Sequence, residues 1–276
     1  MSSEINQEDY RAFKEFLQDA SGILLGDNKQ YLVKSRLRRI MADNRFSSLG
    51  ELVQRLRQNP RSALRETVID AMTTNETLWF RDTHPFRILE EQLLPEMAAE
   101  NSSQPIRIWS AACSTGQEPY SLAIVIDEYR RRNPGRLRRP IEIIATDVSK
   151  PVVDAAREGT YELLALGRGL SADRQKQYFT QLASGSWQVK KEIRDMVTFR
   201  EHNLLERFNF GRFDIVLCRN VLIYFSSDLK QDILVRTHGV LKKGGYLILG
   251  ASESFNGLNP YYEMIQCRPG IIYRAK

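Results

Sequence analysis

Polar and small residues that could do chemistry follow apolar, strand-like runs at several places in the sequence. In chain order these are the segment SAACSTGQEPYS at residues 110–121, then Asp147, then Arg219 and Asn220, and finally Ser252 and Glu253. In an open α/β sheet, ligands bind beyond the carboxyl ends of the strands, near the point where the strand order reverses. These groups are therefore the first candidates for a ligand site.

The segment at residues 110–121 matches neither of two common catalytic loops. Ser114-Thr115-Gly116 lacks the lysine that follows in a Walker phosphate loop, and Gly116 alone does not make the G-x-S-x-G of a nucleophile elbow. Its small residues would still let a flat or compact uncharged ligand lie close to the backbone. We interpret Cys113 as a small packing residue, because free cysteine behaves as a small hydrophobe.

Asp147 and the segment MTTNETLWFRD at residues 72–82 each allow two interpretations. Asp147 closes an apolar run, where a carboxylate can accept both hydroxyls of a ribose, but it could equally cap the helix that follows. The segment 72–82 combines polar turn residues with Trp79, Phe80 and Arg81. It either borders a cleft or forms a packed joint in which Arg81 makes a structural ion pair.

The elements that must position these groups alternate between strands and helices. We predict strands at 106–109, 141–146, 213–218 and 246–250, and helices at about 117–132, 149–157 and 227–241. Continuous apolar strands separated by helices indicate a parallel sheet covered on both faces. The tail MIQCRPGIIYRA at residues 264–275 predicts a hairpin around Pro269-Gly270, which would make the sheet edge antiparallel.

A long stretch before residue 213 interrupts this alternation. Within it, WQVKKEI (187–193) and MVTFREHN (196–203) have the pattern of short antiparallel strands, with Asp195 near their turn. We therefore predict a small β insertion at about residues 165–200.

Residues 6–72 are helical in pattern almost throughout, and one helix has a basic side. Two stripes at helical spacing are expected there: an apolar stripe of Val33, Leu37 and Ile40, and a cationic stripe of Lys34, Arg38 and Arg45. The cationic stripe is either a solvated face or a docking surface for an acidic helix or nucleic acid. Without interleaved exposed aromatics, it fits an acidic protein surface at least as well as single-stranded nucleic acid.

Composition excludes several classes of protein. The chain has 276 residues, of which 42% are hydrophobic, and a formal net charge of +6. It has no apolar stretch of membrane-spanning length and starts with a polar segment, so we expect a cytoplasmic protein without membrane insertion. Its cysteines, Cys113, Cys218 and Cys267, are widely spaced, and with only 3 histidines no metal-ligand spacing occurs. We expect neither disulfides nor a metal.

Taken together, the motifs TTNETLWFRD, IRIWSAACSTGQEPYSLA, ATDVSK, HNLL and FDIVLCRNVLIYF resemble the CheR-type chemotaxis receptor methyltransferases. The resemblance covers nearly the whole chain. It implies a helical receptor-docking domain (1–72), a linker bordering the active site (73–90), and a doubly wound methyltransferase domain with a reversed edge strand (91–276). It also implies transfer of a methyl group from S-adenosylmethionine to glutamates of bacterial chemoreceptors, leaving S-adenosylhomocysteine, in sensory adaptation.

The resemblance assigns roles to residues that match the family's motifs. Glu118 matches the carboxylate of the family's GEEPYS, in which Gln117 replaces the commoner glutamate. The cofactor contacts that it implies are Asn75, Thr77, Arg81, Glu118, Asp147, Asn203, Leu204, Asn220 and Val221. Arg81 would also hold the substrate carboxylate, and Tyr224 would supply a hydroxyl nearby. Because a glutamate side chain has a pKa of about 4.3, it is already a nucleophile near neutral pH and needs no general base or metal.

The resemblance also sharpens the expected partners. The basic helix, through Lys34, Arg38 and Arg45, would dock on the acidic methylation region of transmembrane chemoreceptors and bring the enzyme to receptor arrays; regulatory proteins are further possible partners. The short loop ASGSWQVKKEIRD at 183–195 predicts independence from a receptor C-terminal pentapeptide. The alternatives are a dinucleotide-dependent oxidoreductase, disfavoured by the missing G-x-G-x-x-G, and a non-catalytic receptor-binding module, disfavoured by the complete set of site residues.

Overall fold

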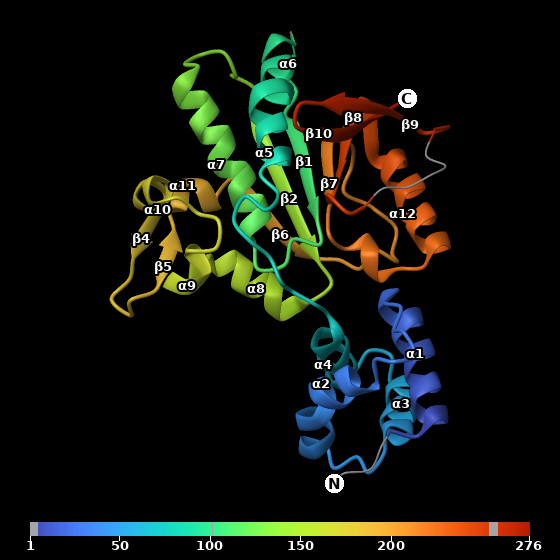
Figure 1. The fold of residues 1–276 in the computed structure, drawn as a ribbon. Coiled ribbons are helices and arrows are strands. Elements are labelled where there is room, and N and C mark those ends of the chain that lie inside the picture. The colour runs from blue at the N-terminus through green and yellow to red at the C-terminus, as the bar shows by residue number, and fades with distance from the viewer. Residues whose placement is uncertain (1–4, 101, 254–258) are drawn as a thin grey trace.

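The computed structural model describes residues 5–100, 102–253 and 259–276, and it consists of a helical N-terminal part below an α/β part (Figure 1). The N-terminal helices are α1 (Gln7–Ser21), α2 (Gln30–Asp43), α3 (Leu49–Gln58) and α4 (Ala63–Met72). Side chains of Asn6, Ser48 and Ser62 cap three of them by accepting a backbone N–H of the first turn. The apolar faces of these helices meet in a core of their own.

Within the described residues the main sheet has seven strands in the order β6-β2-β1-β7-β8-β10-β9. The parallel strands are β1 (Ile106–Ala111), β2 (Ile141–Asp147), β6 (Val197–Glu201), β7 (Phe213–Cys218) and β8 (Leu241–Leu249). The strand order reverses between β1 and β7, since the chain passes outward from β1 to β2 and then returns. The predicted parallel sheet is therefore confirmed, and its switch point lies at the ends of β1 and β7.

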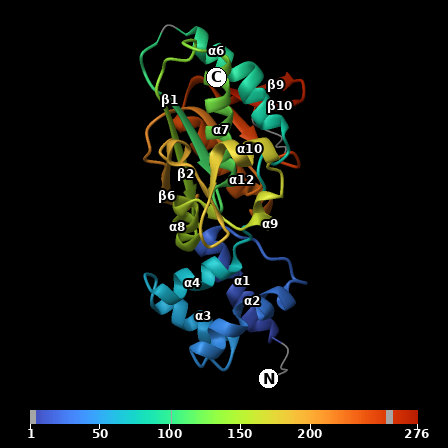
Figure 2. The ribbon, with the colours of Figure 1, turned by 90° about the vertical axis from the view of Figure 1, so that its left-hand side faces the viewer.

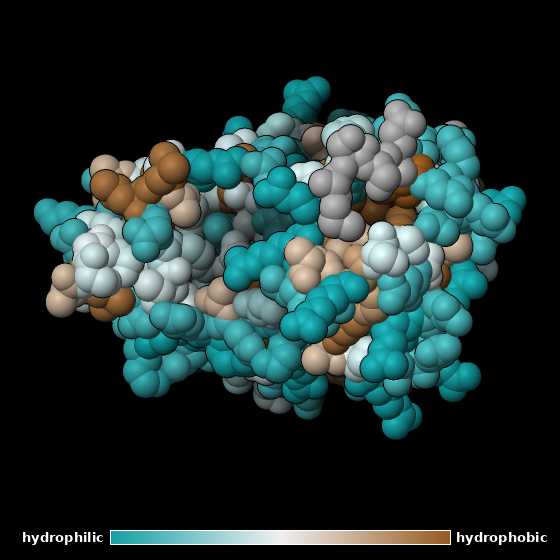
Figure 3. Space-filling view, turned by 90° about the horizontal axis from the view of Figure 1, so that it is seen from below, coloured by the Kyte–Doolittle hydropathy of each residue, from teal (hydrophilic) through white to brown (hydrophobic). Residues whose placement is uncertain are grey.

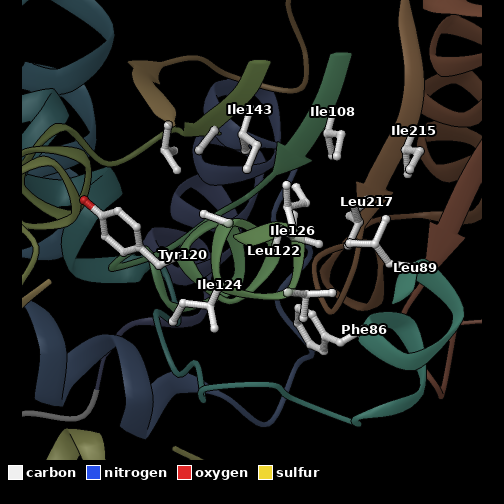
Figure 4. Packing of buried hydrophobic residues seen from close by; sticks show 14 of the residues in the cluster. Phe86, Leu89, Ile108, Tyr120, Leu122, Ile124, Ile126, Ile143, Ile215 and Leu217 are labelled. Atoms are coloured by element: carbon white, nitrogen blue, oxygen red, sulfur yellow. The ribbon is translucent and has the colours of Figure 1, made fainter. Parts of the chain in front are cut away.

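Alternating side chains of these strands bury both faces of the sheet. Ile108 and Ile215 belong to one core, whereas their neighbours Trp109 and Val216 belong to the other. The first core is covered by α7 (Gln117–Arg132) and by the continuous helical segment α5 (His84–Ile88), η1 (Leu89–Leu93) and α6 (Leu94–Ala99). Figure 4 shows side chains of α7 between the strand residues and the residues of α5 and η1. Helix α12 (Ser227–Val240) covers the second core.

The edge of the sheet beyond β8 is antiparallel, as the sequence predicted. Strand β10 (Gly270–Ala275) runs antiparallel to β8, and β9 (Tyr262–Cys267) pairs with β10 through the register Gly270↔Cys267. The hairpin around Pro269-Gly270 is thus confirmed.

The region between β2 and β7 departs from the prediction. A small sheet has the order β3-β5-β4, with β3 (Thr160–Tyr161), β4 (Phe179–Gln181) and β5 (Trp187–Val189), beside helices α8 (Lys150–Glu158), α9 (Leu163–Leu166), α10 (Ala172–Tyr178) and α11 (Lys191–Arg194). The predicted antiparallel pairing of WQVKKEI with MVTFREHN is wrong. The first segment pairs within the small sheet, and the second becomes β6, parallel to β2 at the edge of the main sheet.

The physical reason is that alternate residues of β6, Val197 and Phe199, are buried in the main core. An edge strand of either direction has this same alternating pattern, so sequence alone does not tell the two apart. The small sheet lies to the left of the main sheet in Figure 1, and Figure 3 shows apolar surface at that end of the molecule. There, α9 exposes Leu163 and Leu164.

Helix α2 carries the predicted stripes only in part. Val33 and Leu37 are buried and Ile40 is partly buried, whereas Lys34 and Arg38 are exposed. The expectation that Arg45 continues the cationic stripe is wrong, because the helix ends at Asp43 and Arg45 has a φ of 60°. Arg45 is exposed in the turn that follows.

Direct hydrogen bonds join the helical part to the α/β part, which lie one above the other in Figure 2. Asn203 Nδ2 donates to the carbonyl of Ala20 at 2.9 Å, and the backbone N–H of Leu24 donates to the carbonyl of Tyr224 at 2.8 Å. These bonds fix the end of α1 against the carboxyl ends of the strands. Among the described residues, a helix with the length and apolarity to cross a membrane is not found.

Candidate active site

A cavity of about 900 Å³, including its open mouth, lies beyond the carboxyl ends of β1, β2 and β7. Its wall contains every residue that we predicted as a cofactor contact or catalytic group, namely Asn75, Thr77, Arg81, Glu118, Asp147, Asn203, Leu204, Asn220, Val221 and Tyr224. Ser21, the last residue of α1, and Ile23, just after it, also line the cavity. The site is therefore built jointly by the helical part, the linker and the sheet.

The loop after β1 turns sharply at the cavity. Ala112, Ser114 and Gly116 all have positive φ, at 61°, 50° and 94°. A side chain on Gly116 would be strained by this backbone and would lie 3.1 Å from the hydroxyl of Tyr161. Tyr161 instead donates that hydroxyl to the carbonyl of Thr115 at 2.6 Å. The turn places Ala112, Cys113 and Ser114 in the wall of the cavity.

Asp147 ends β2 and is held by backbone donors on both sides. Its Oδ2 accepts the N–H of Ser114 at 2.8 Å, and its Oδ1 accepts the N–H of Ser149 at 3.1 Å. Burial raises the pKa of this carboxyl, and the backbone hydrogen bonds oppose that rise. Because each oxygen can accept a second hydrogen bond, the group can still receive hydroxyls of a ligand. The side chain that caps α8 is Ser149, so Asp147 is not the helix cap.

Glu118, in the first turn of α7, forms a buried network with Arg219. Its Oε1 accepts the hydroxyl of Ser110 at 2.8 Å, and its Oε2 accepts Nη1 of Arg219 at 2.7 Å. Nη2 of Arg219 also donates to Asp82 Oδ2 and to the carbonyl of Arg81, both at 2.8 Å. The sequence analysis named Arg219 as a polar group after a strand but assigned it no catalytic or cofactor-binding role. It ties the linker to the wall of the cavity.

Six residues of the linker line the cavity, and the three predicted ones, Asn75, Thr77 and Arg81, are each half-buried. The carbonyl of Asn75 accepts the hydroxyl of Ser114 at 2.7 Å, which fastens the linker to the loop after β1. Thr77 lies between Asn75 and Arg81 along the same wall. Arg81 Nη1 donates to the carbonyl of Glu76 at 3.1 Å. Its guanidinium has no carboxylate within ion-pair distance in the part of the chain that the structure describes, unlike that of Arg219.

The segment after β6 forms a further part of the wall. Leu204 is buried and supplies apolar surface. Asn203 donates its Nδ2 to the carbonyl of Ala20, and its Oδ1 accepts the N–H of Leu205 at 3.0 Å. His202 also lines the cavity, and burial lowers its pKa. Its buried Nε2 has no hydrogen-bond partner within the described residues. His202 precedes the predicted pair in the HNLL motif, but sequence reasoning assigned it no role.

The turn after β7 brings Asn220, Val221 and Tyr224 to the cavity. Asn220 has a φ of 58°, a left-handed conformation that asparagine tolerates better than most residues. The chain then forms the short helix η2 (Leu222–Tyr224), which directs Tyr224 into the wall. The predicted docking residues Lys34, Arg38 and Arg45 do not line this cavity.

Known families match most of the chain. The all-alpha domain of CheR methyltransferase matches residues 8–73, and the SAM binding domain of CheR methyltransferase matches residues 75–271. The chain belongs to the CheR methyltransferase family. Chemotaxis protein methyltransferase 1 of Pseudomonas aeruginosa is 56% identical over 97% of this chain and 98% of its own length. Chemotaxis protein methyltransferase Cher2 of Pseudomonas putida is 55% identical over the same shares, 97% and 98%.

This CheR-family chain is therefore an S-adenosylmethionine-dependent methyltransferase that acts in chemotaxis. The predicted fold class, a helical N-terminal domain with a methyltransferase sheet, is confirmed. The oxidoreductase alternative is excluded by family membership.

The cavity suits this cofactor in the chemistry of its groups. Leu204 and Val148 offer apolar surface for a base, and Asp147 offers acceptors for ribose hydroxyls. Glu118 is less free than we expected, because Arg219 and Ser110 already occupy its carboxylate. Its contact with the amino acid end of the cofactor stays a prediction.

Proposed function

We propose that this protein transfers the methyl group of S-adenosylmethionine to glutamate side chains in the cytoplasmic methylation region of chemoreceptors. The products would be glutamate methyl esters and S-adenosylhomocysteine. One observation supports an acidic acceptor. The guanidinium of Arg81 lies in the wall of the cavity, and no carboxylate of the described residues pairs with it. A substrate carboxylate would supply the missing counter-charge.

The residues of the cavity would act mainly by alignment. When bound, S-adenosylmethionine supplies a methyl group on a positively charged sulfur. A glutamate carboxylate is ionised near neutral pH, so no residue of the chain has to remove a proton. Arg81 would orient the carboxylate, and Tyr224 would donate its hydroxyl to the same group. In well-oriented reactions such alignment contributes as much as about 7–11 kcal/mol.

Holding the cofactor would fall to three parts of the wall. Asp147 would accept the ribose hydroxyls, Asn203 and Leu204 would lie beside the adenine, and Asn220 and Val221 would close the cavity from the β7 side. Asn75 and Thr77 would contact the cofactor from the linker, with Glu118 near its amino acid end. The linker is well placed for this because Ser114 and Arg219 already fasten it to the sheet.

We propose that α2 docks the enzyme on its substrate. Lys34 and Arg38 are exposed on one side of this helix, and neither forms an ion pair with any described residue. Arg36, on another side, instead donates Nη1 to the carbonyls of Met72 and Thr73 at 2.7 and 2.8 Å, anchoring α2 to the start of the linker. The cations of Lys34 and Arg38 are therefore available to an acidic receptor helix. Arg45 would contribute from the following turn.

The catalytic assignment can be tested by methyl transfer. Labelled S-adenosylmethionine would be incubated with receptor-containing membranes and either the wild type, Arg81→Ala or Arg81→Lys. We expect Arg81→Ala to lower kcat by roughly 100-fold, the usual order for removing one charge-stabilising donor. Arg87→Ala is the matched control, because Arg87 forms only an exposed pair with Glu91. Undiminished transfer by Arg81→Ala would remove the assignment, and a product that resists mild base would exclude a methyl ester.

The docking proposal needs a charge-reversal pair and its control. We expect Lys34→Glu/Arg38→Glu to lower receptor methylation while the Kd for S-adenosylhomocysteine, measured by calorimetry, stays near the wild-type value. Arg136→Glu/Arg138→Glu makes the same change in net charge on the exposed loop before β2, at the opposite end of the sheet. If both double variants lost methylation equally, the change in net charge alone would explain the loss and the docking proposal would fail. A parallel loss of cofactor affinity in Lys34→Glu/Arg38→Glu would also contradict docking.

Receptor docking would bring the enzyme to chemoreceptor arrays in the cytoplasm, and we propose this location on the same grounds. On this proposal each part of the chain has its own role: residues 1–72 would dock on the receptor, residues 73–90 would border the active site, and residues 91–276 would bind the cofactor.

A further inference from the structure

We infer that Glu253, just beyond β8, is a positioning residue that holds the turn after β7 in its cofactor-binding shape. The inference rests on the proposed role of Asn220 and Val221 as cofactor contacts. Glu253 does not line the cavity, but it lies directly behind this turn and is 9% exposed. No cation within ion-pair distance of it occurs in the described residues, so its carboxylate serves the backbone.

The carboxylate of Glu253 collects backbone donors from two sequence regions. Its Oε2 accepts the N–H of Asn220 at 2.6 Å and the N–H of Gly250 at 2.9 Å. Its Oε1 accepts the N–H of Ile223 at 3.2 Å. Hydrogen bonds to an ionised acceptor are stronger than those between neutral groups. One of these donors, Asn220, precedes η2, and another, Ile223, lies within it. One side chain thus fixes both ends of the segment from Asn220 to Ile223.

This segment needs such support because its backbone is unusual. Asn220 has a φ of 58°, a conformation that an isolated chain populates sparsely. Gly250 completes the arrangement: a Cβ at this position would lie 2.6 Å from Glu253 Oε2, 2.9 Å from Asn220 Nδ2 and 3.0 Å from Asn220 N. The absence of a side chain at Gly250 lets the turn and the carboxylate approach each other.

The consequence concerns Tyr224 as well as the cofactor contacts. Tyr224 follows Ile223 in η2, so the bond from Ile223 to Glu253 sets the position from which Tyr224 enters the cavity. A glutamine in place of Glu253 can accept at only one of its two terminal atoms, and its amide nitrogen would face a backbone N–H. It would satisfy either the Asn220 and Gly250 donors or the Ile223 donor, and the turn would lose its fixed shape.

The test compares Glu253→Gln with Glu263→Gln in the full-length protein. Glu263 pairs with Arg274 at the surface of the sheet edge, away from the cavity. For Glu253→Gln we expect the Kd for S-adenosylhomocysteine, measured by calorimetry well below the unfolding temperature, to rise about tenfold. The KM for S-adenosylmethionine should rise in parallel, Glu253→Asp should restore part of both, and Glu263→Gln should match the wild type. A lower unfolding temperature with an unchanged Kd would overturn the inference.

Gly250→Ala provides a second route if Glu253→Gln does not fold. Its Cβ would push the carboxylate of Glu253 away from Asn220, although neither residue is itself substituted. We therefore expect a similar rise in the Kd for S-adenosylhomocysteine. Wild-type affinity would contradict the inference. Asn220→Gly, which keeps the left-handed backbone unstrained, tests the proposed cofactor contact of Asn220 separately from the positioning role of Glu253. If it retains full affinity, the proposed role of Asn220 fails. If it weakens binding while Glu253→Gln and Gly250→Ala do not, only the role of Glu253 fails.

Discussion

Replacing Arg219 by methionine would test whether the buried ion-pair network holds the site together. The Arg219 side chain is 1% exposed, and its partners Glu118 and Asp82 are 11% and 28% exposed. Methionine keeps much of the volume but leaves the carboxylate of Glu118 buried without a counter-charge. Breaking a buried pair in this way costs about 3–5 kcal/mol, of which solvent around Asp82 screens a part. We expect a loss of about 3 kcal/mol in the free energy of unfolding.

Urea denaturation, followed separately by tryptophan fluorescence and circular dichroism, would measure this loss. The double variant Glu118→Gln/Arg219→Met removes the uncompensated charge and should recover about half of it. A loss below about 1 kcal/mol, or a double variant no more stable than the single one, would refute our account of the network. The single variant should also bind S-adenosylhomocysteine more weakly, since Arg219 fastens the carbonyl of Arg81 and thereby the linker.

Further predictions concern single groups in the same cavity and the receptor tail. Tyr224→Phe should lower kcat for receptor methylation roughly tenfold with little change in cofactor Kd, which steady-state kinetics and calorimetry would distinguish. Because burial lowers the pKa of His202 below 6.5, the unfolded chain takes up its proton first on acidification, and stability is lost as the pH falls below 6.5. His202→Phe should therefore reduce the fall of the urea midpoint between pH 6.5 and about 5. Removing the last five residues of a receptor should leave its methylation rate unchanged; a large drop would contradict independence from that tail.

Sequence reasoning located the strands of the main sheet well because their residues are buried on both faces. Short continuous apolar runs, such as those ending at Asp147 and Cys218, are typical of strands in a covered parallel sheet. Of the polar residues named after these strands, Asp147, Arg219 and Asn220 lie around one cavity, whereas Ser252 and Glu253 do not line it. The small sheet was harder to predict, since its strands have only two or three residues and its neighbour β6 has the alternation of any edge strand.

What sequence could not supply is the pairing between distant side chains. Glu118 and Arg219 lie 101 positions apart, and nothing in either motif states that one neutralises the other. The helix end at Asp43 was missed for a local reason: no glycine or proline follows it to mark the stop. Glu253 was noticed as a strand-end carboxylate, but its backbone partners become visible only in three dimensions.

Ser21 at the end of α1 lines the cavity that we propose for the cofactor, and the neighbouring Ala20 accepts a hydrogen bond from Asn203 of the same wall, which has a thermodynamic consequence. If a partner bound to these helices shifts the end of α1, it changes the affinity for the cofactor by some factor. By linkage, the cofactor must then change the affinity for that partner by the same factor. An enzyme with a shared wall can thus favour its substrate when loaded and release it when the spent cofactor leaves, without a separate regulatory site.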